Sequence, residues 1–175
     1  LLDYESIPEE NKMKLHETTE RNLIIDETAE ISSDARIIPS IRETKIVIGA
    51  NTHIYEFVVI KAVGGDGDII IGENCYINPN STLYSGNGIT LKNYVLIGPG
   101  TVIAPTNHAF QRRDEYIRHQ GFVPSRGGVF IEEDVWIGAN SVVLDGTRIE
   151  RGAIIAAGSV VKGNIPAYTI WGGVP

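Results

Sequence analysis

The sequence contains little cysteine, little positive charge and no long hydrophobic run, and each absence excludes a class of protein. Cys75 is the one cysteine among 175 residues. No disulfide can therefore form within the chain, and we expect a cytoplasmic protein in a reducing compartment. Lys and Arg number 15 against 22 Asp and Glu, and the net charge of −7 provides no basic face for nucleic acid or an anionic membrane. The purely aliphatic runs are a few residues long, so we expect neither a signal peptide nor a membrane span.

An aliphatic residue recurs at every sixth position over most of the chain. The clearest run consists of Ile131, Ile137, Val143, Ile149, Ile155 and Val161. A period of six is typical neither of an α-helix nor of an ordinary strand, but it fits a short strand and a turn, repeated. The residue four positions after the aliphatic one is mostly small or β-branched, which suits a tight corner: Ala29, Ala35, Thr52, Val58, Cys75, Ser81, Thr101, Ser141, Thr147, Ala153 and Ser159. The pattern predicts one structural unit that repeats within a single domain and packs against its neighbours.

Four interruptions divide this rhythm, and each follows a whole number of three-hexad groups. They occupy residues 43–47, 66–70, 89–90 and 109–130. If three hexads form one turn of a triangular coil, all four insertions leave from the same corner. We therefore expect about six coils within residues 23–175, with one long loop insertion at 109–128. Residues 1–22 lie outside the repeat and are predicted to form a short N-terminal arm or cap over the end of the coil.

The longest interruption begins directly after Asn107 and His108, so His108 stands at a coil corner beside a polar loop. An imidazole at the edge of a groove suits a general base at neutral pH. A corner histidine that only hydrogen-bonds to backbone explains the same position equally well. Spacing alone does not separate these two interpretations.

Five motifs follow one another in the second half of the chain. They are Ile97-Gly98-Pro99, Asn107-His108, Glu133-Asp134-Val135-Trp136-Ile137-Gly138-Ala139-Asn140, Ala157-Gly158-Ser159-Val160-Val161 and Gly172-Gly173-Val174-Pro175. With this order and spacing, the chain from about Ile48 to Pro175 resembles bacterial hexapeptide-repeat acetyltransferases of the galactoside, maltose and surface-polysaccharide type. The resemblance implies an all-β fold, a left-handed parallel β-helix with about 18 residues per turn. It also implies a homotrimer with active sites between subunits. The repeat alone does not provide the handedness.

The resemblance further implies direct transfer of an acetyl group from acetyl-CoA to a hydroxyl of a small sugar, a nucleotide-sugar or a surface-polysaccharide precursor. His108 would remove the proton from the acceptor hydroxyl as its oxygen attacks the thioester carbonyl. A backbone N–H would stabilise the oxyanion, at a place the sequence does not reveal. A backbone carbonyl, Asp114 or Glu115 are the candidates for orienting the imidazole.

The acceptor-binding residues that the resemblance implies are Tyr76, Asn78, Asn107 and Arg113. Tyr76 would offer a ring face to a sugar and Asn78 a hydrogen bond, although an asparagine that tolerates left-handed backbone at a corner explains Asn78 nearly as well. An acidic pair of the galactoside-type enzymes falls on Ser85-Gly86 here, which argues against galactoside specificity. The loop 110–121 instead resembles the surface-polysaccharide branch, and its arginines would meet a diphosphate or an acidic glycan.

The acetyl-CoA-binding residues that the resemblance implies are Trp136, Ala139, Ala157, Gly158, Ser159 and Lys162. Trp136 resembles a tryptophan that packs near the pantetheine arm, and the small residues permit close approach of the cofactor. Lys162 is displaced by one position from the corresponding lysine of the relatives, so it would approach a CoA phosphate from a different direction.

Three other interpretations compete with this one. A zinc carbonic anhydrase needs three converging histidines, which the spacing of His53, His108 and His119 does not support, so no metal is expected. An N-acetyltransferase acting on an amino nucleotide-sugar would use the same base and stays open. A non-enzymatic structural or binding module explains the repeats but not His108, Trp136 or the long loop. Cys75 is interpreted as a packing residue rather than a nucleophile.

Overall fold

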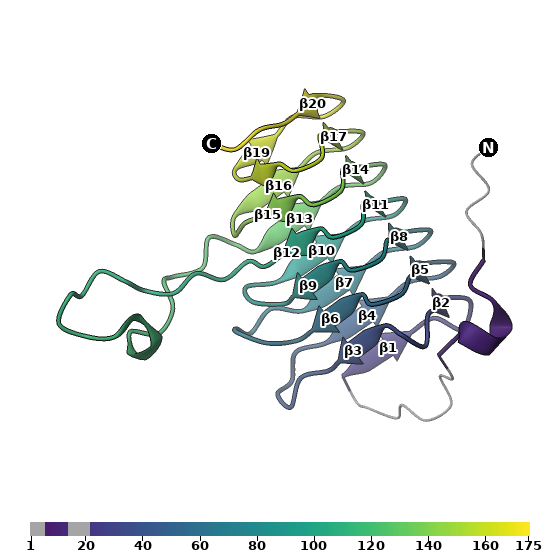
Figure 1. The fold of residues 1–175 in the computed structure, drawn as a ribbon, viewed down its shortest axis with the longest axis horizontal. Helices are drawn as coiled ribbons and strands as arrows, with labels where there is room; N and C mark the ends of the chain where they lie inside the picture. Colours follow the sequence, from purple (N-terminus) through teal and green to yellow (C-terminus); the bar gives the residue numbers. More distant parts are fainter. Residues whose placement is uncertain (1–5, 14–21) are drawn as a thin grey trace.

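The hexad repeat forms a coil of short parallel strands that stack into three sheets (Figure 1). The computed structural model describes residues 6–13 and 22–175 of the chain. Each turn of the coil contributes strands to the sheets in the same order, so neighbours in a sheet come from successive turns. In these described ranges the helical segments are two three-residue 3-10 turns, η1 (Glu9–Asn11) and η3 (Ile117–His119), and no helix has the length and apolar character to cross a membrane.

The three sheets contain the following strands. The first sheet consists of β1 (Leu23–Ile25), β4 (Ile46–Ile48), β7 (Ile69–Ile71), β10 (Ile89–Leu91), β13 (Val129–Ile131), β16 (Thr147–Ile149) and β19 (Asn164–Ile165). The second consists of β2 (Glu30–Ile31), β5 (His53–Ile54), β8 (Tyr76–Ile77), β11 (Leu96–Ile97), β14 (Trp136–Ile137), β17 (Ile154–Ile155) and β20 (Ile170–Trp171). The third consists of β3 (Arg36–Ile38), β6 (Val59–Lys61), β9 (Thr82–Tyr84), β12 (Val102–Ile103), β15 (Val142–Val143) and β18 (Val160–Val161).

Each strand points an aliphatic side chain into the space between the sheets, and successive turns place these side chains in columns. The column of the second sheet consists of Ile31, Ile54, Ile77, Ile97, Ile137 and Ile155, none of them more than 2% exposed. The small and β-branched residues predicted at the corners are all buried too. Stacking therefore removes a continuous apolar surface from water, which is the main favourable contribution to folding of such a coil.

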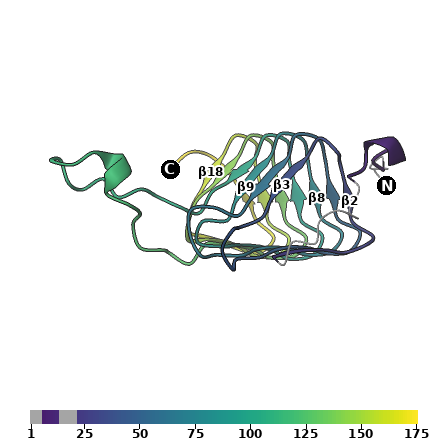
Figure 2. The same cartoon turned by 90° about the horizontal axis from the view of Figure 1, so that it is seen from below.

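All the insertions leave the coil at one corner, as predicted. This corner, called the loop corner below, connects each strand of the third sheet to the next strand of the first sheet. Its six connections are residues 39–45, 62–68, 85–88, 104–128, 144–146 and 162–163. Connection 104–128 extends far from the body of the coil (Figures 1 and 2). The long loop thus leaves the coil at the corner that the interruptions of the six-residue repeat predicted.

Strands β19 and β20 continue the coil into a seventh turn, beyond the six coils predicted. The loop corner between β18 and β19 contains only Lys162 and Gly163, and Gly163 has a φ of 75°. This tight corner shortens the step from Val161 to the next inward residue, Ile165, to four residues, which hides the repeat in the sequence. In the second sheet Trp171 then pairs with Ile155, at a position where earlier turns have an aliphatic residue.

The described part of the N-terminal arm covers the open edge of β2. Lys12 forms an antiparallel bridge with Ser32, and the Met13 N–H donates to the Ile31 carbonyl over 2.7 Å. A covered edge strand offers no free hydrogen-bonding row to another chain. Residues 1–5 and 14–21 of the predicted arm lie outside the described residues, so the extent of a cap over 1–22 stays a prediction.

An ion-pair network ties this arm to the first two turns. Glu30 accepts hydrogen bonds from the Ile7 N–H over 3.1 Å and from Lys12 Nζ over 3.0 Å. Its Oε2 lies 3.4 Å from Nδ1 of His53, whose ring stacks on Tyr76 with centroids 4.7 Å apart. Burial lowers the pKa of His53 below its usual value of 6.5, and it outweighs the raising effect of the Glu30 carboxylate.

The free energy of unfolding should therefore fall as the pH drops below 6.5 and the buried imidazole is forced to bind a proton. A group with a lowered folded-state pKa binds protons more readily when unfolded, so its stabilising contribution is present above 6.5 and is lost towards lower pH. His53→Phe keeps a ring on Tyr76 and should flatten the dependence of Tm on pH between about 7 and 5. His119→Phe, at an exposed loop histidine, is the control for losing one imidazole. Equal slopes for wild type and His53→Phe would contradict this account.

Candidate active site

His108 lies near the base of the long loop, where two antiparallel limbs pair. It forms an isolated bridge with Phe122. On either side, the Val123 N–H donates to the Asn107 carbonyl and the Ala109 N–H to the Gly121 carbonyl, both over 3.0 Å. The His108 ring lies against the Phe122 ring, with centroids 4.7 Å apart, and the histidine is exposed. The paired limbs therefore present an accessible imidazole on a fixed backbone, as a general base requires.

The acids proposed to orient His108 form ion pairs elsewhere. Asp114 and Glu115 lie 3.2 and 3.0 Å from the Arg112 guanidinium, and this pairing closes the tip of the loop. Both carboxylates pair with a neighbouring arginine here, so of the candidates for orienting His108 a backbone carbonyl is the one that this pairing does not engage. No residue in the described ranges accepts or donates a hydrogen bond at the imidazole, so its nitrogens are available to a ligand.

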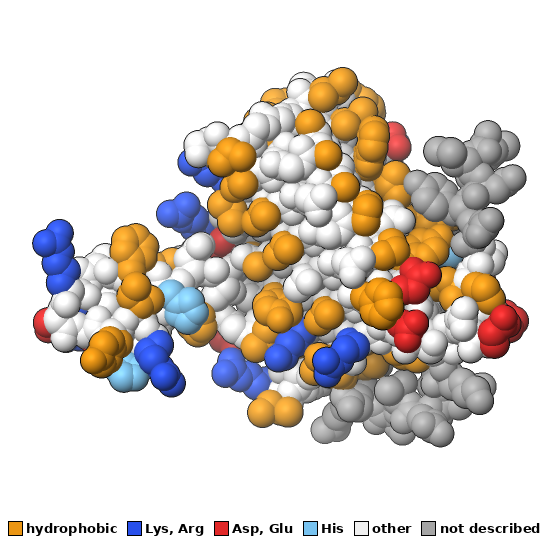
Figure 3. Space-filling model, viewed as in Figure 1, with side chains coloured by type: hydrophobic (Ala, Val, Ile, Leu, Met, Phe, Trp, Pro, Cys, Tyr) orange, Lys and Arg blue, Asp and Glu red, His pale blue; other side chains and the backbone are white. Residues whose placement is uncertain are grey.

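The loop tip presents its remaining cations to solvent. Arg113 is exposed and forms no ion pair with a described residue. It lines a shallow hollow together with the Arg112-bound acids and Tyr116. Figure 3 shows blue (Lys, Arg) and pale blue (His) side chains on the loop that extends from the body of the coil. Arg113 is thus placed to meet an anionic group that approaches the loop, but it does not contact His108 within one chain.

The predicted acceptor residues Tyr76 and Asn78 lie on the second sheet and the corner that follows it. Tyr76 stacks on His53 as described. Asn78 Nδ2 donates to the Ile97 carbonyl of the next turn over 2.8 Å. At the same corner Asn80 has a left-handed φ of 62°, which asparagine tolerates well. The amide of Asn78 therefore holds two turns together, and its oxygen and second N–H are left for a ligand.

The predicted acetyl-CoA residues other than Lys162 lie on the same sheet and corner, further along the coil. Trp136 points outward from β14 and is 49% exposed. Ala157 and Gly158 are exposed at the corner, whereas Ser159 is buried. Ser159 Oγ donates to the Ala156 carbonyl over 2.6 Å and accepts from the Gly173 N–H over 3.2 Å. Its side chain is thus structural, and only its backbone is in a position to line a channel.

Glycine at this corner allows successive turns to approach closely. A Cβ at Gly98 would lie 2.6 Å from the backbone nitrogen of Ala139, and one at Gly138 would lie 2.5 Å from that of Ala157. Both distances are too short for any side chain. The Ile-Gly pattern therefore reflects contact between backbones, and the same contact leaves the small residues Ala139 and Ala157 at the surface of the corner.

The predicted site residues form two groups on different corners of one chain. His108, Asn107, Arg113 and Lys162 belong to the loop corner, with the exposed Lys162 two turns beyond His108. Tyr76, Asn78, Trp136, Ala139, Ala157, Gly158 and Ser159 belong to the second sheet and the corner after it. The third sheet separates the two groups, so within a single chain Lys162 is the one proposed cofactor residue on the same corner as the histidine.

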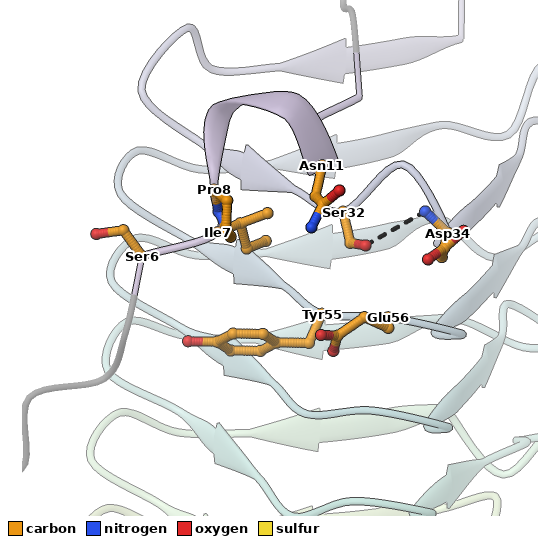
Figure 4. Close-up of a pocket in the computed structure, with 8 residues that line it drawn as sticks. All are labelled: Ser6, Ile7, Pro8, Asn11, Ser32, Asp34, Tyr55 and Glu56. Atoms are coloured by element: carbon orange, nitrogen blue, oxygen red, sulfur yellow. Dashed lines mark hydrogen bonds between the residues drawn. The ribbon is translucent and has the colours of Figure 1, made fainter.

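No feature elsewhere in the described residues has the chemistry of a competing active site. A hollow under the arm (Figure 4) lies on the first two turns, whereas His108 follows the fourth, and it contains none of the predicted site residues. Its lining consists of Ser6, Ile7, Pro8, Asn11, Ser32, Asp34, Tyr55 and Glu56. Within the described ranges no three His, Cys, Asp or Glu side chains converge as metal ligands. Burial raises the pKa of the Cys75 thiol to about 11, which suits packing rather than nucleophilic attack.

Sequence reasoning missed two polar residues at the loop corner, Asn87 and Asp145. Asp145 is 4% exposed and accepts a hydrogen bond from Asn87 Nδ2 over 3.0 Å. Asp145 is buried and Asn87 half-buried, and the hexad spacing carries no signal for their contact because it forms only when the coil returns to the same corner. The returning limb of the long loop covers them.

Comparison with known proteins agrees with the repeat. Residues 128–163 match the family described as bacterial transferase hexapeptide (six repeats), and residues 68–105 match the hexapeptide repeat of succinyl-transferase. A galactoside O-acetyltransferase of Lactococcus lactis subsp. lactis is 34% identical over 111 residues, 63% of this chain and 52% of that protein. A 2,3,4,5-tetrahydropyridine-2,6-dicarboxylate N-acetyltransferase of Staphylococcus aureus is 52% identical over 52 residues, 30% of this chain and 22% of that protein. The chain thus spans about half, or less, of the length of these relatives.

Solved structures share the coil. AntD, an N-acyltransferase from Bacillus cereus crystallised as a variant with dTDP-4-amino-4,6-dideoxyglucose and coenzyme A, superposes with a TM-score of 0.72 at 24% identity, covering 87% of this chain and 80% of that one. A hexapeptide transferase family protein from Anaplasma phagocytophilum superposes with a TM-score of 0.67 at 23% identity, covering 87% and 75%. The left-handed parallel β-helix predicted from the sequence is confirmed. Its stacked hexads, its two matched segments and this coil are similar to those of hexapeptide-repeat transferases.

Proposed function

We propose that the protein transfers an acetyl group from acetyl-CoA to a hydroxyl of a sugar, a nucleotide-sugar or a surface-polysaccharide precursor. The observation that carries the proposal is His108, exposed on paired limbs at the loop corner with no described hydrogen-bond partner on its imidazole. The galactoside O-acetyltransferase that shares 34% identity, and the nucleotide-sugar and coenzyme A bound to AntD, support the two substrate classes. A thioester donor of this kind would place the enzyme in the cytoplasm.

His108 acts as the general base in this proposal. The imidazole takes the proton of the acceptor hydroxyl while the oxygen forms a bond to the thioester carbonyl carbon. The C–S bond then breaks, and the proton passes from the imidazolium to the departing CoA sulfur. A positioned base contributes about 10²–10⁴ in rate, and the proximity of the two bound substrates supplies much of the remainder.

The cofactor would lie along the corner that follows the second sheet. Trp136 offers an exposed ring for the pantetheine arm, and Ala139, Ala157 and Gly158 leave room for close approach. Lys162 would reach a phosphate of the cofactor from the loop corner. The candidates for holding the acceptor are Tyr76, Asn107, Arg113 and the remaining amide groups of Asn78.

These residues meet only if a second copy of the chain supplies one of the two groups. We therefore propose a homotrimer with the active sites in the grooves between neighbouring coils. The outward side chains of the third sheet support close packing, since Val59, Thr82, Val102, Val142 and Val160 form a flat β-branched row. Sedimentation at assay concentration should show three chains, and a monomer with full activity would contradict the shared site.

The test of the proposed function is a screen of sugars, nucleotide-sugars and oligosaccharides with acetyl-CoA, in which thiol release is measured. Release that depends on an acceptor supports transfer. An ester product that is labile to base indicates O-acetylation. A stable amide indicates the second candidate, an amino-sugar N-acetyltransferase, which the Staphylococcus aureus relative and AntD favour. No release with any acceptor would favour the non-enzymatic module.

A further inference from the structure

A buried carboxylate closes the base of the long loop. Asp145, at the loop corner between β15 and β16, forms no ion pair with a described residue. Three neutral donors satisfy it instead. Its Oδ1 accepts from the Gly128 N–H over 2.9 Å, and its Oδ2 accepts from the Arg126 N–H over 2.9 Å and from Asn87 Nδ2 over 3.0 Å. Moving the returning limb away would leave this charge buried without partners, which is unfavourable by more than the loss of an ordinary hydrogen bond.

Asn87 extends the same contact to the outgoing limb. Its backbone N–H donates to the Pro105 carbonyl over 3.1 Å, while its side chain donates to Asp145. Glycines make room for both limbs, because a Cβ at Gly86 would lie 2.7 Å from the Pro105 carbonyl oxygen and one at Gly128 would lie 2.7 Å from that of Asn87. The connection of the preceding turn, 85–88, therefore holds the outgoing limb of the loop. The connection of the following turn, 144–146, holds the returning limb.

The two held limbs determine the position of His108. Between Gly128 and the first interlimb hydrogen bond at Val123 there are only four residues, among them Pro124. Proline restricts the backbone of that short connection. Beyond it, the limbs pair at Phe122 and His108. Phe122 provides the one described side-chain contact of the imidazole, so the histidine depends on the limbs for its place.

We infer that Asp145 is a positioning residue that acts through the loop limbs to hold His108 in its reactive place. This inference rests on the proposed function. Asp145 touches neither substrate nor His108, and its effect belongs to the chemical step rather than to cofactor binding. A misplacement of about 1 Å in a catalytic group is enough to lower a rate by about a hundredfold.

The test is Asp145→Asn, which keeps the shape of the side chain. An amide must turn its NH₂ towards either the Gly128 N–H or the Arg126 and Asn87 donors, so at least one hydrogen bond is lost. We expect kcat to fall by about tenfold to a hundredfold, with the KM for acetyl-CoA changed by less than about twofold. Hydrogen exchange should accelerate at the amides of residues 107–109 and 121–128, and nowhere else in the coil.

Thr52→Val is the matched control. The Thr52 hydroxyl is also buried at a corner, where it donates to the Gly72 carbonyl over 2.8 Å and accepts from the Cys75 N–H over 3.1 Å, away from the loop. The Thr52→Val variant should have a lower Tm than the wild type but the same kcat. Wild-type kcat in Asp145→Asn, or an equal loss of kcat in Thr52→Val, would overturn the inference. If the wild-type protein transfers no acetyl group, the proposed function fails and the catalytic role of Asp145 fails with it. Hydrogen exchange at residues 107–109 and 121–128 that is the same in Asp145→Asn as in the wild type would separately disprove that Asp145 holds the loop limbs.

Discussion

Replacing His108 with alanine is expected to lower kcat for acetyl transfer by about 10²–10⁴-fold while leaving the fold intact. The rate falls because no other described side chain at this position is able to take the proton of the acceptor hydroxyl. The fold persists because the imidazole is exposed and its one ring contact among the described residues is with Phe122. Steady-state kinetics with acetyl-CoA and thermal unfolding measure the two effects, and the KM for acetyl-CoA should change little.

Added imidazole separates lost base chemistry from a disturbed loop. It should restore part of the rate of His108→Ala, because a free base in solution replaces the missing one. Glu43→Ala, an exposed substitution at the loop corner of the first turn, is the control and should keep the wild-type rate. A His108→Ala protein with unchanged kcat would remove the histidine from the mechanism.

Replacing Ile71 with alanine is expected to lower the free energy of unfolding by about 2–5 kcal/mol. Ile71 is 1% exposed and lies in the inward column of the first sheet, between Ile48 and Leu91. A cavity there interrupts the column in the third turn, and the neighbouring turns cannot collapse into it because their spacing is set by strand pairing.

The same strand supplies the control. Ile70 points outward from β7 and is only partly buried, so Ile70→Ala should cost less than about 1 kcal/mol. Denaturant unfolding of both variants at one protein concentration provides the comparison. Equal losses would mean that the inward columns do not dominate the stability of the coil, contrary to the burial pattern.

Much of the coil could be predicted from the sequence because its signal is local and repeats. Buried aliphatic residues recur every sixth position within a turn, so the period and the corner of each insertion follow directly from spacing. The seventh turn was hidden because the Lys162-Gly163 corner shortens one step and Trp171 takes an aliphatic position. Handedness did not follow from spacing, since a left- or right-handed coil buries the same residues.

The candidate site was predictable only in part. The break after His108 located the histidine, but the pairing of Asp114 and Glu115 with Arg112 is a choice among near neighbours that composition does not decide. Asp145 and Asn87 lie 58 residues apart and meet only because the coil returns to the same corner. Contacts of this kind depend on the tertiary structure, so the spacing of the hexads does not reveal them.

The central claim is that the site joins His108 of one chain to the cofactor corner of another, and co-expression of two inactive variants tests it most directly. His108→Ala lacks the base. Ala157→Glu places a negative charge at an exposed corner position where CoA would lie, so its fold should persist. Each variant alone should be inactive, whereas random trimers of the two contain both intact groups in about one groove in four. Recovery of about a quarter of the wild-type activity is the predicted result, and no recovery in mixed trimers of confirmed composition would contradict the shared site.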